Sequence, residues 1–232
     1  MRLYLDSAMV GDVAPLLRTG AFAGVTTTPG SLARVGVLRD DVPLLVADLV
    51  AAGAPEVVVE ARGREPETLL RDARRLTTVH PVVTVALPAT RPGLAAATAL
   101  VAEGRTVLVS GVVRPGQLLA ALGTGCRWVA PHVASGAGLG GGTGPGARPA
   151  DGGAHLRADA LADALCMQDV LAASGARERT ALLATGVLDE DALVRLAVAG
   201  VAAATLAPEL AGSLLDDEAT GTGAEDPQPA GP

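Results

Sequence analysis

The sequence predicts an α/β protein, and within that class a (β/α)8 TIM barrel. Two observations carry this prediction. Eight short apolar segments recur along the chain, and most are continuous Val, Leu and Ala, as expected of parallel strands covered by helices. Longer stretches with helical patterning separate them. The 232 residues, 49% of them hydrophobic, are enough for one such core. A doubly wound parallel sheet is the alternative, because the number of strands is what separates the two folds.

The expected strands are residues 2–6, 24–28, 56–61, 82–87, 105–110, 127–133, 180–185 and 202–207. The clearest helical stretches between them are residues 66–79, 94–102, 156–173 and 189–199. Two of these stretches begin with favourable first-turn residues. Pro66 is followed by Glu67, and Asp189 by Glu190, which suits the positive N-terminal end of a helix.

Residues 1–215 are expected to form a single barrel that carries a Gly-rich loop at 135–153. This loop follows the sixth strand and contains nine glycines. A mobile lid or a phosphate cradle is one interpretation, and a flexible insertion is the favoured one. A Walker-type loop is excluded because no Gly-Lys-Ser/Thr follows. Residues 216–232 hold five acids, no base and no bulky apolar residue, so we expect a disordered acidic tail.

The basic residues set the strongest limit on chemistry. Lys and Arg together number 18, and the sequence shows that all 18 are Arg. Because Arg stays protonated at physiological pH, no side chain of this chain can offer a neutral primary amine. Imine chemistry through a lysine is therefore excluded, and we expect no cofactor to replace it.

Composition also limits the partners. One Trp, one Tyr, one Phe and a net charge of −7 argue against nucleic-acid binding. No window approaches a membrane span of about 20 apolar residues, and the opening residues lack the apolar core of a signal peptide. We expect a cytoplasmic protein, from a bacterium with a GC-rich genome. Cys126 and Cys166 fit no metal spacing or disulfide framework, and both are expected in the core.

Active sites of TIM barrels lie at the C-terminal ends of the strands, where this chain has three titratable side chains. Asp6 and Glu60 end apolar strands, and His132 ends the sixth. They are candidate acid and base groups. The structural alternatives are a salt bridge from a carboxylate to Arg62 or Arg114, plain exposure, or a buried structural histidine. A weak metal site made of all three is a lesser possibility, and we expect no metal.

Several motifs resemble the transaldolase family, in particular its short branch of fructose-6-phosphate aldolase-like proteins. The opening carries MRLYLDSA and then AGVTTTPGSLA. The middle carries VVTVALPATRPGLAAATAL and GQLLAALGTGCRWVAPHV, and the C-terminal part ALLATGVLDEDALVRLAVAGVAAATLAPELAGSLL. The resemblance implies a TIM barrel, small phosphorylated sugars or aldehydes as ligands, and homo-oligomers.

By this resemblance, the chain shares the scaffold of the family but differs from it at the residues that carry the chemistry. It retains Asp6 as the proton-handling acid, and it aligns the Schiff-base lysine with Ala86, a glutamine with Glu60 and a tyrosine with His132. The phosphate-binding arginine and serine align with Ser135 and Gly186. The positions expected to bind a ligand are Thr26, Thr28, Ser110, Ser135, Thr185 and Gly186.

The sequence thus favours a transaldolase-like barrel that has lost Schiff-base chemistry and binds a small polar carbonyl or sugar-like ligand. Fewer fixed positive charges and a possible second carboxylate favour a ligand without phosphate. The alternative is a lysine-free lyase or isomerase that uses Asp6, Glu60 and His132 as acid/base groups. A structural partner of an active paralogue is a third possibility.

Overall fold

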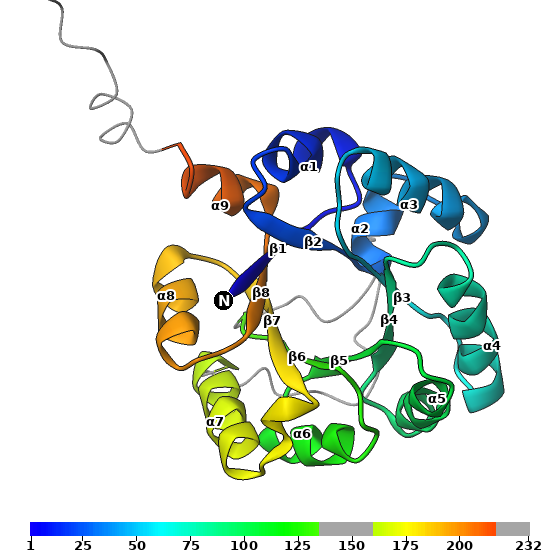
Figure 1. The fold of residues 1–232 in the computed structure, drawn as a ribbon, viewed down its shortest axis with the longest axis vertical. Helices are drawn as coiled ribbons and strands as arrows, with labels where there is room; N and C mark the ends of the chain where they lie inside the picture. The colour runs from blue at the N-terminus through cyan, green and yellow to red at the C-terminus, as the bar shows by residue number, and fades with distance from the viewer. Residues whose placement is uncertain (135–159, 217–232) are drawn as a thin grey trace, which may run out of the picture.

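A closed barrel of eight parallel strands forms the centre of the molecule (Figure 1). The computed structural model describes residues 1–134 and 160–216. Each strand pairs with the next along the chain, and β8 pairs back onto β1. The strands are β1 (Arg2–Asp6), β2 (Phe22–Thr27), β3 (Val57–Glu60), β4 (Val83–Pro88), β5 (Val107–Val112), β6 (Trp128–Pro131), β7 (Ala181–Val187) and β8 (Ala203–Leu206). The predicted TIM barrel is confirmed, and closure excludes the doubly wound sheet.

Helices surround the strands as an outer ring in Figure 1. In the described residues they are α1 (Val10–Leu17), α2 (Pro29–Arg34), α3 (Val42–Ala51), α4 (Pro66–Thr77), α5 (Arg91–Ala102), α6 (Pro115–Leu122), α7 (Ala160–Ala173), α8 (Glu190–Val198) and α9 (Pro208–Ser213). Two 3-10 helices, η1 (Arg39–Asp41) and η2 (Ala176–Glu178), precede α3 and β7. The helix α5 begins three residues before the predicted start, because the Thr90 side chain caps it by accepting from the Gly93 amide at 3.3 Å.

Alternation along the strands separates two apolar cores. On β3, Val57 and Val59 point outward and pack beneath the helices, whereas Val58 points into the barrel. On β4, Val85 faces the helices and Ala86 faces the interior. Because successive side chains alternate between the two faces, Glu60 follows Val58 into the interior. The barrel interior is therefore apolar in its middle and polar toward the C-terminal end.

Aromatic rings and a buried network fill the N-terminal end of the barrel. Tyr4 and Trp128 meet edge to face, with their ring centroids 6.4 Å apart. The Tyr4 hydroxyl and the Thr84 hydroxyl each donate to Glu56 at 2.7 Å. The Arg2 guanidinium lies 5.3 Å from the Tyr4 ring centroid and 3.3 Å from the Glu56 carboxylate. These groups satisfy one another, so the polar groups available to a ligand inside the barrel are those at its other end.

One sequence prediction about the core is wrong. Cys126 is buried as expected, but Cys166 is exposed. The helix α7 turns Ala164, Met167 and Leu171 toward the barrel, and Cys166 lies about 100° around the helix axis from Met167. The predicted Gly-rich loop at 135–153 and all but Asp216 of the predicted tail lie outside the described residues. Within the described residues, no helix combines the length and the apolar character that crossing a membrane requires.

Candidate functional site

The C-terminal end of the barrel brings the predicted side chains to one rim. Asp6 shares a face with the interior residue Tyr4, Ser110 with Leu108, and Thr185 with Leu183. The residues at or within two positions of the strand ends are Asp6 on β1, Thr26 on β2, Glu60 on β3, Ser110 on β5, His132 just after β6, and Thr185 and Gly186 on β7. We call this set the barrel mouth. Its members come from segments far apart in the chain, as expected of a barrel active site.

Asp6 is the most strongly perturbed acid of the mouth. Burial raises the pKa of its carboxyl from the ordinary 3.8 to about 6, and the positive charge of Arg34 on α2 opposes part of that rise. Across residues 1–134 and 160–216, no hydrogen bond or ion pair to the Asp6 carboxyl is found. A carboxyl in such a place holds its proton close to neutral pH, which suits proton transfer.

Glu60 lies beside Ala86 of β4 and accepts a hydrogen bond from a residue of β5, the next strand beyond β4. The Ser110 hydroxyl donates to Glu60 Oε2 at 3.4 Å, from the strand on the far side of β4. The register pairs Glu60 with Ala86, whose side chain is a single buried methyl group. Burial raises the pKa of Glu60, while the Ser110 hydrogen bond and the charge of Arg62 lower it. The salt bridge to Arg62 or Arg114, which the sequence left open as a structural alternative for Glu60, is absent from the described residues.

His132 makes one hydrogen bond within the barrel mouth. Its Nδ1 lies 3.3 Å from Thr185 Oγ1, and Thr185 Oγ1 in turn donates to the Pro131 carbonyl at 3.2 Å. Its Nε2 is buried and has no hydrogen-bond partner in the described part of the chain. Burial lowers the pKa of the imidazole below its ordinary 6.5, so the ring is neutral at physiological pH.

Glycine at position 186 makes room for the imidazole of His132. Gly186 has φ of +73°, and a Cβ built there would lie 2.5 Å from His132 Cε1. That separation is shorter than any van der Waals contact. The residue at 186 is therefore coupled to the ring at 132, a pairing that the sequence alone did not reveal.

Two threonines predicted to bind a ligand already have partners. Thr26 Oγ1 lies 2.6 Å from Thr205 Oγ1 of β8, beside Asp6 in the register of β1 and β2. Thr28 caps α2: its Oγ1 accepts from the Ser31 amide at 3.0 Å, and Ser31 Oγ accepts from the Thr28 amide at 2.8 Å. The remaining predicted contact, Ser135, lies outside the described residues.

Sequence reasoning missed the arginines that support the mouth. Arg34 acts on Asp6 as described above. Arg39 donates to the backbone carbonyl of Glu60 at 3.3 Å and forms a two-pronged ion pair with Asp72, whose carboxylate also accepts from the Arg62 amide at 2.6 Å. This arrangement fixes the end of β3. No spacing in the sequence links these residues, since Arg39 and Asp72 lie 33 positions apart.

The barrel mouth does not form a metal centre in the described residues. There, no group of three His, Cys, Asp or Glu side chains is placed to hold a metal ion. Asp6, Glu60 and His132 share the same rim, but no hydrogen bond or ion pair joins any two of these three residues. The arrangement suits separate contacts to one small organic ligand better than common ligation of a cation.

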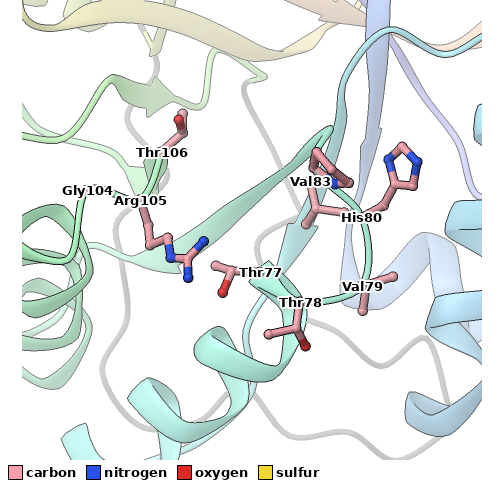
Figure 2. A pocket seen from close by; sticks show the side chains of 9 residues that line it. Thr77, Thr78, Val79, His80, Val83, Gly104, Arg105 and Thr106 are labelled. Atoms are coloured by element: carbon pink, nitrogen blue, oxygen red, sulfur yellow. The ribbon is translucent and has the colours of Figure 1, made fainter.

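A pocket of about 390 Å³ lies at the other end of the barrel (Figure 2). Its lining comes from the turns that precede β4 and β5, and includes Thr77, His80 and Arg105. In Figure 2 the Arg105 and Thr77 side chains point toward one another, whereas the His80 ring points away. The polar groups therefore do not converge on one point, and none of the predicted site residues lines this pocket.

Comparison with known proteins finds similarity to curated transaldolases. The chain is 32% identical over 142 residues to a protein named probable transaldolase from Thermus thermophilus, covering 57% of this chain and 62% of that protein. It is 32% identical over 133 residues to one from Rhodospirillum centenum, with 57% and 56% covered. It is 33% identical over 138 residues to one from Exiguobacterium sibiricum, with 57% and 61% covered.

The chain thus spans about three-fifths of the length of the curated relatives it matches. No protein-family model matches it. The closed eight-stranded barrel and the similarity to these proteins together support a transaldolase-like family for this chain.

Proposed function

We propose that this chain is a transaldolase-like barrel without Schiff-base chemistry, and that its mouth binds a small polar carbonyl or sugar-like ligand. One observation carries the proposal. At the interior position on β4 where the resemblance implies the imine-forming lysine, the chain has Ala86, and it has no lysine elsewhere. A methyl group cannot attack a carbonyl, so the covalent route to carbon–carbon cleavage is missing.

The charges in the mouth favour a neutral ligand. Burial raises the pKa of both Asp6 and Glu60, so the mouth disfavours the charged form of each carboxyl. The phosphate contacts that the resemblance implies are a serine at the position of Gly186 and an arginine at that of Ser135. Neither glycine nor serine can supply the charge-assisted hydrogen bonds that fix a phosphate. The polar side chains that remain in the mouth match the hydroxyl and carbonyl groups of an uncharged ligand.

A binding comparison tests this proposal directly. Ligand-observed NMR would compare dihydroxyacetone, fructose and fructose 6-phosphate on the full chain and on His132→Ala, with Asp48→Asn on the exposed face of α3 as the matched control. We expect the two neutral compounds to bind the full chain, to bind His132→Ala at least several-fold more weakly, and to bind the control unchanged. Absence of binding by all three compounds, or a tenfold preference for the phosphate ester over fructose, contradicts the proposal.

One observation favours a second candidate, a lysine-free enzyme acting by acid/base catalysis. Burial raises the pKa of Asp6 to about 6 and lowers the pKa of His132, so the mouth holds a carboxyl that keeps its proton to higher pH and an imidazole that favours its neutral form. Such a pair can move a proton at the carbon beside a carbonyl, as lyases and isomerases do.

Solvent exchange tests the second candidate. We expect deuterium from the solvent to enter the carbon-bound positions of dihydroxyacetone in the presence of the full chain, and His132→Ala to abolish this exchange. No exchange above the rate of free imidazole would refute acid/base catalysis and leave the binding role standing.

A homo-oligomer is part of the proposal, as the resemblance implies. Large apolar side chains on and beside α8 support it: Leu188 is 69% exposed, Val194 50% and Val198 84%. Sedimentation velocity on the full chain is expected to give a species larger than one chain. A monomer at micromolar concentration contradicts this part.

A further inference from the structure

The hydrogen bonds around Thr185 determine which nitrogen of His132 carries the proton. Thr185 Oγ1 lies 3.2 Å from the Pro131 carbonyl and 3.3 Å from His132 Nδ1. A carbonyl oxygen can only accept, and a hydroxyl has a single proton to give. The Thr185 proton therefore goes to Pro131. The hydroxyl oxygen is left as an acceptor, and His132 Nδ1 must donate to it.

A neutral imidazole with its proton on Nδ1 has a lone pair on Nε2. That atom is buried and has no partner in the described residues. A buried acceptor without a donor costs about 1–3 kcal/mol, so the position is favourable only when something donates to it. None of the mouth residues described above does so. A hydroxyl group of a bound ligand would be a matching donor.

The ring can take this orientation only because residue 186 has no side chain. The Cβ built at Gly186 would lie 2.5 Å from Cε1, 2.9 Å from Nδ1 and 3.0 Å from Nε2 of His132. A serine or alanine at that position would push the ring away and break its bond to Thr185. Gly186 and Thr185 thus hold the imidazole from two sides.

We propose that Thr185 and Gly186 are positioning residues that hold His132 as the Nδ1–H tautomer, and that its Nε2 accepts a hydroxyl proton from a hydroxylated carbonyl or polyol ligand. The ligand part rests on the proposed function, whereas the tautomer part stands on the hydrogen bonds alone. The proposal deepens the ligand class: it requires a hydroxyl donor and excludes ligands that only accept.

Nitrogen NMR of histidine-labelled chain tests the tautomer, and His80 is the internal reference. His80 Nδ1 accepts from the Val82 amide at 3.3 Å, so His80 is expected as the opposite, Nε2–H tautomer. The variant His155→Gln removes the one remaining histidine signal. We expect His132 to show a protonated Nδ1 and a bare Nε2. A His132 ring protonated on Nε2 overturns the tautomer.

Two variants separate positioning from simple support of the fold. Thr185→Ser keeps the hydroxyl, so it is expected to retain the Nδ1–H signature. Thr185→Val removes the acceptor and is expected to shift His132 toward a mixture of tautomers, with the His80 signals unchanged as proof of folding. An unchanged His132 signature in folded Thr185→Val overturns the role of Thr185. If that variant does not fold, loss of the signature in Thr185→Ser overturns it instead.

A pair of probes tests the hydroxyl donor separately. Dihydroxyacetone and acetone share a carbonyl and differ by two hydroxyl groups. We expect the first to shift the Nε2 signal of His132 and the second to leave it in place. Equal shifts from both overturn the hydroxyl donor. No shift from either compound overturns the ligand part and the proposed function. The tautomer part is decided separately, by the nitrogen NMR measurements above.

Discussion

Replacing Asp6 by asparagine gives the sharpest quantitative prediction, because burial disfavours the ionised form of this carboxyl. Burial raises the pKa of Asp6 from 3.8 to about 6 in the folded chain, against the opposing charge of Arg34. The folded state therefore binds the proton more tightly than the unfolded state. The contribution of this tighter proton binding to the free energy of unfolding is fully present below pH 3.8 and is lost as the pH rises through 6.

The size of the effect follows from the gap between the two pKa values. Each unit corresponds to about 1.4 kcal/mol, so a gap of about two units amounts to roughly 2–3 kcal/mol at pH 7 and above. At pH 4 most Asp6 carboxyls are protonated in the folded chain and many are in the unfolded chain, which leaves about 0.5 kcal/mol. Asparagine has nearly the same shape and never ionises, so Asp6→Asn removes this penalty.

Urea unfolding at pH 4 and pH 8 measures the effect. We expect Asp6→Asn to be more stable than the unaltered chain by about 2–3 kcal/mol at pH 8, and by no more than about 0.5 kcal/mol at pH 4. Asp48→Asn, an exposed change on α3, is the control and should give no such pH-dependent difference. A gain for Asp6→Asn that is equal at both pH values, or a loss at pH 8, would refute the burial argument.

Two further predictions concern packing at the two ends of the barrel. Gly186→Ala should lose about 1–3 kcal/mol more stability than Gly20→Ala, because both sites have positive φ (+73° and +75°) but only the Cβ at 186 meets an atom within 4 Å. In urea unfolding, this excess loss should vanish when His132 is also replaced by Ala. Equal losses at the two glycines would argue against the clash with His132. Tyr4→Phe removes a 2.7 Å hydrogen bond to the Glu56 carboxylate and should lower the free energy of unfolding by about 1.5–3 kcal/mol, whereas a change below about 0.5 kcal/mol would show that Glu56 needs no such donor.

The barrel was predictable because its signals are local. Each strand is a short apolar run that helices must cover, and a continuous run such as VVV at 57–59 is typical of a parallel strand that is buried on both faces. The rule that barrel sites lie at strand ends then places Asp6, Glu60 and His132 on one rim. Each of these inferences needs only a residue and its neighbours in the chain.

The partners of these residues were not predictable, because they depend on contacts between distant segments. His132 and Thr185 lie 53 positions apart, and Ser110 and Glu60 lie 50 apart. Only the register of the strands brings them together. The exposure of Cys166 has the same origin: its side of α7 is set by how that helix packs, and the helix is apolar on several faces.

Reductive trapping tests the central claim that no side chain of this protein forms an imine with a carbonyl compound. Intact and peptide mass spectrometry would follow the chain after incubation with dihydroxyacetone and borohydride, alongside Ala86→Lys as the restored amine and Ala95→Lys on the outer face of α5 as a control for nonspecific reaction. We predict no adduct on any internal peptide of the unaltered chain, and an adduct on Ala86→Lys that exceeds that on Ala95→Lys. An internal adduct on the lysine-free chain would contradict the account.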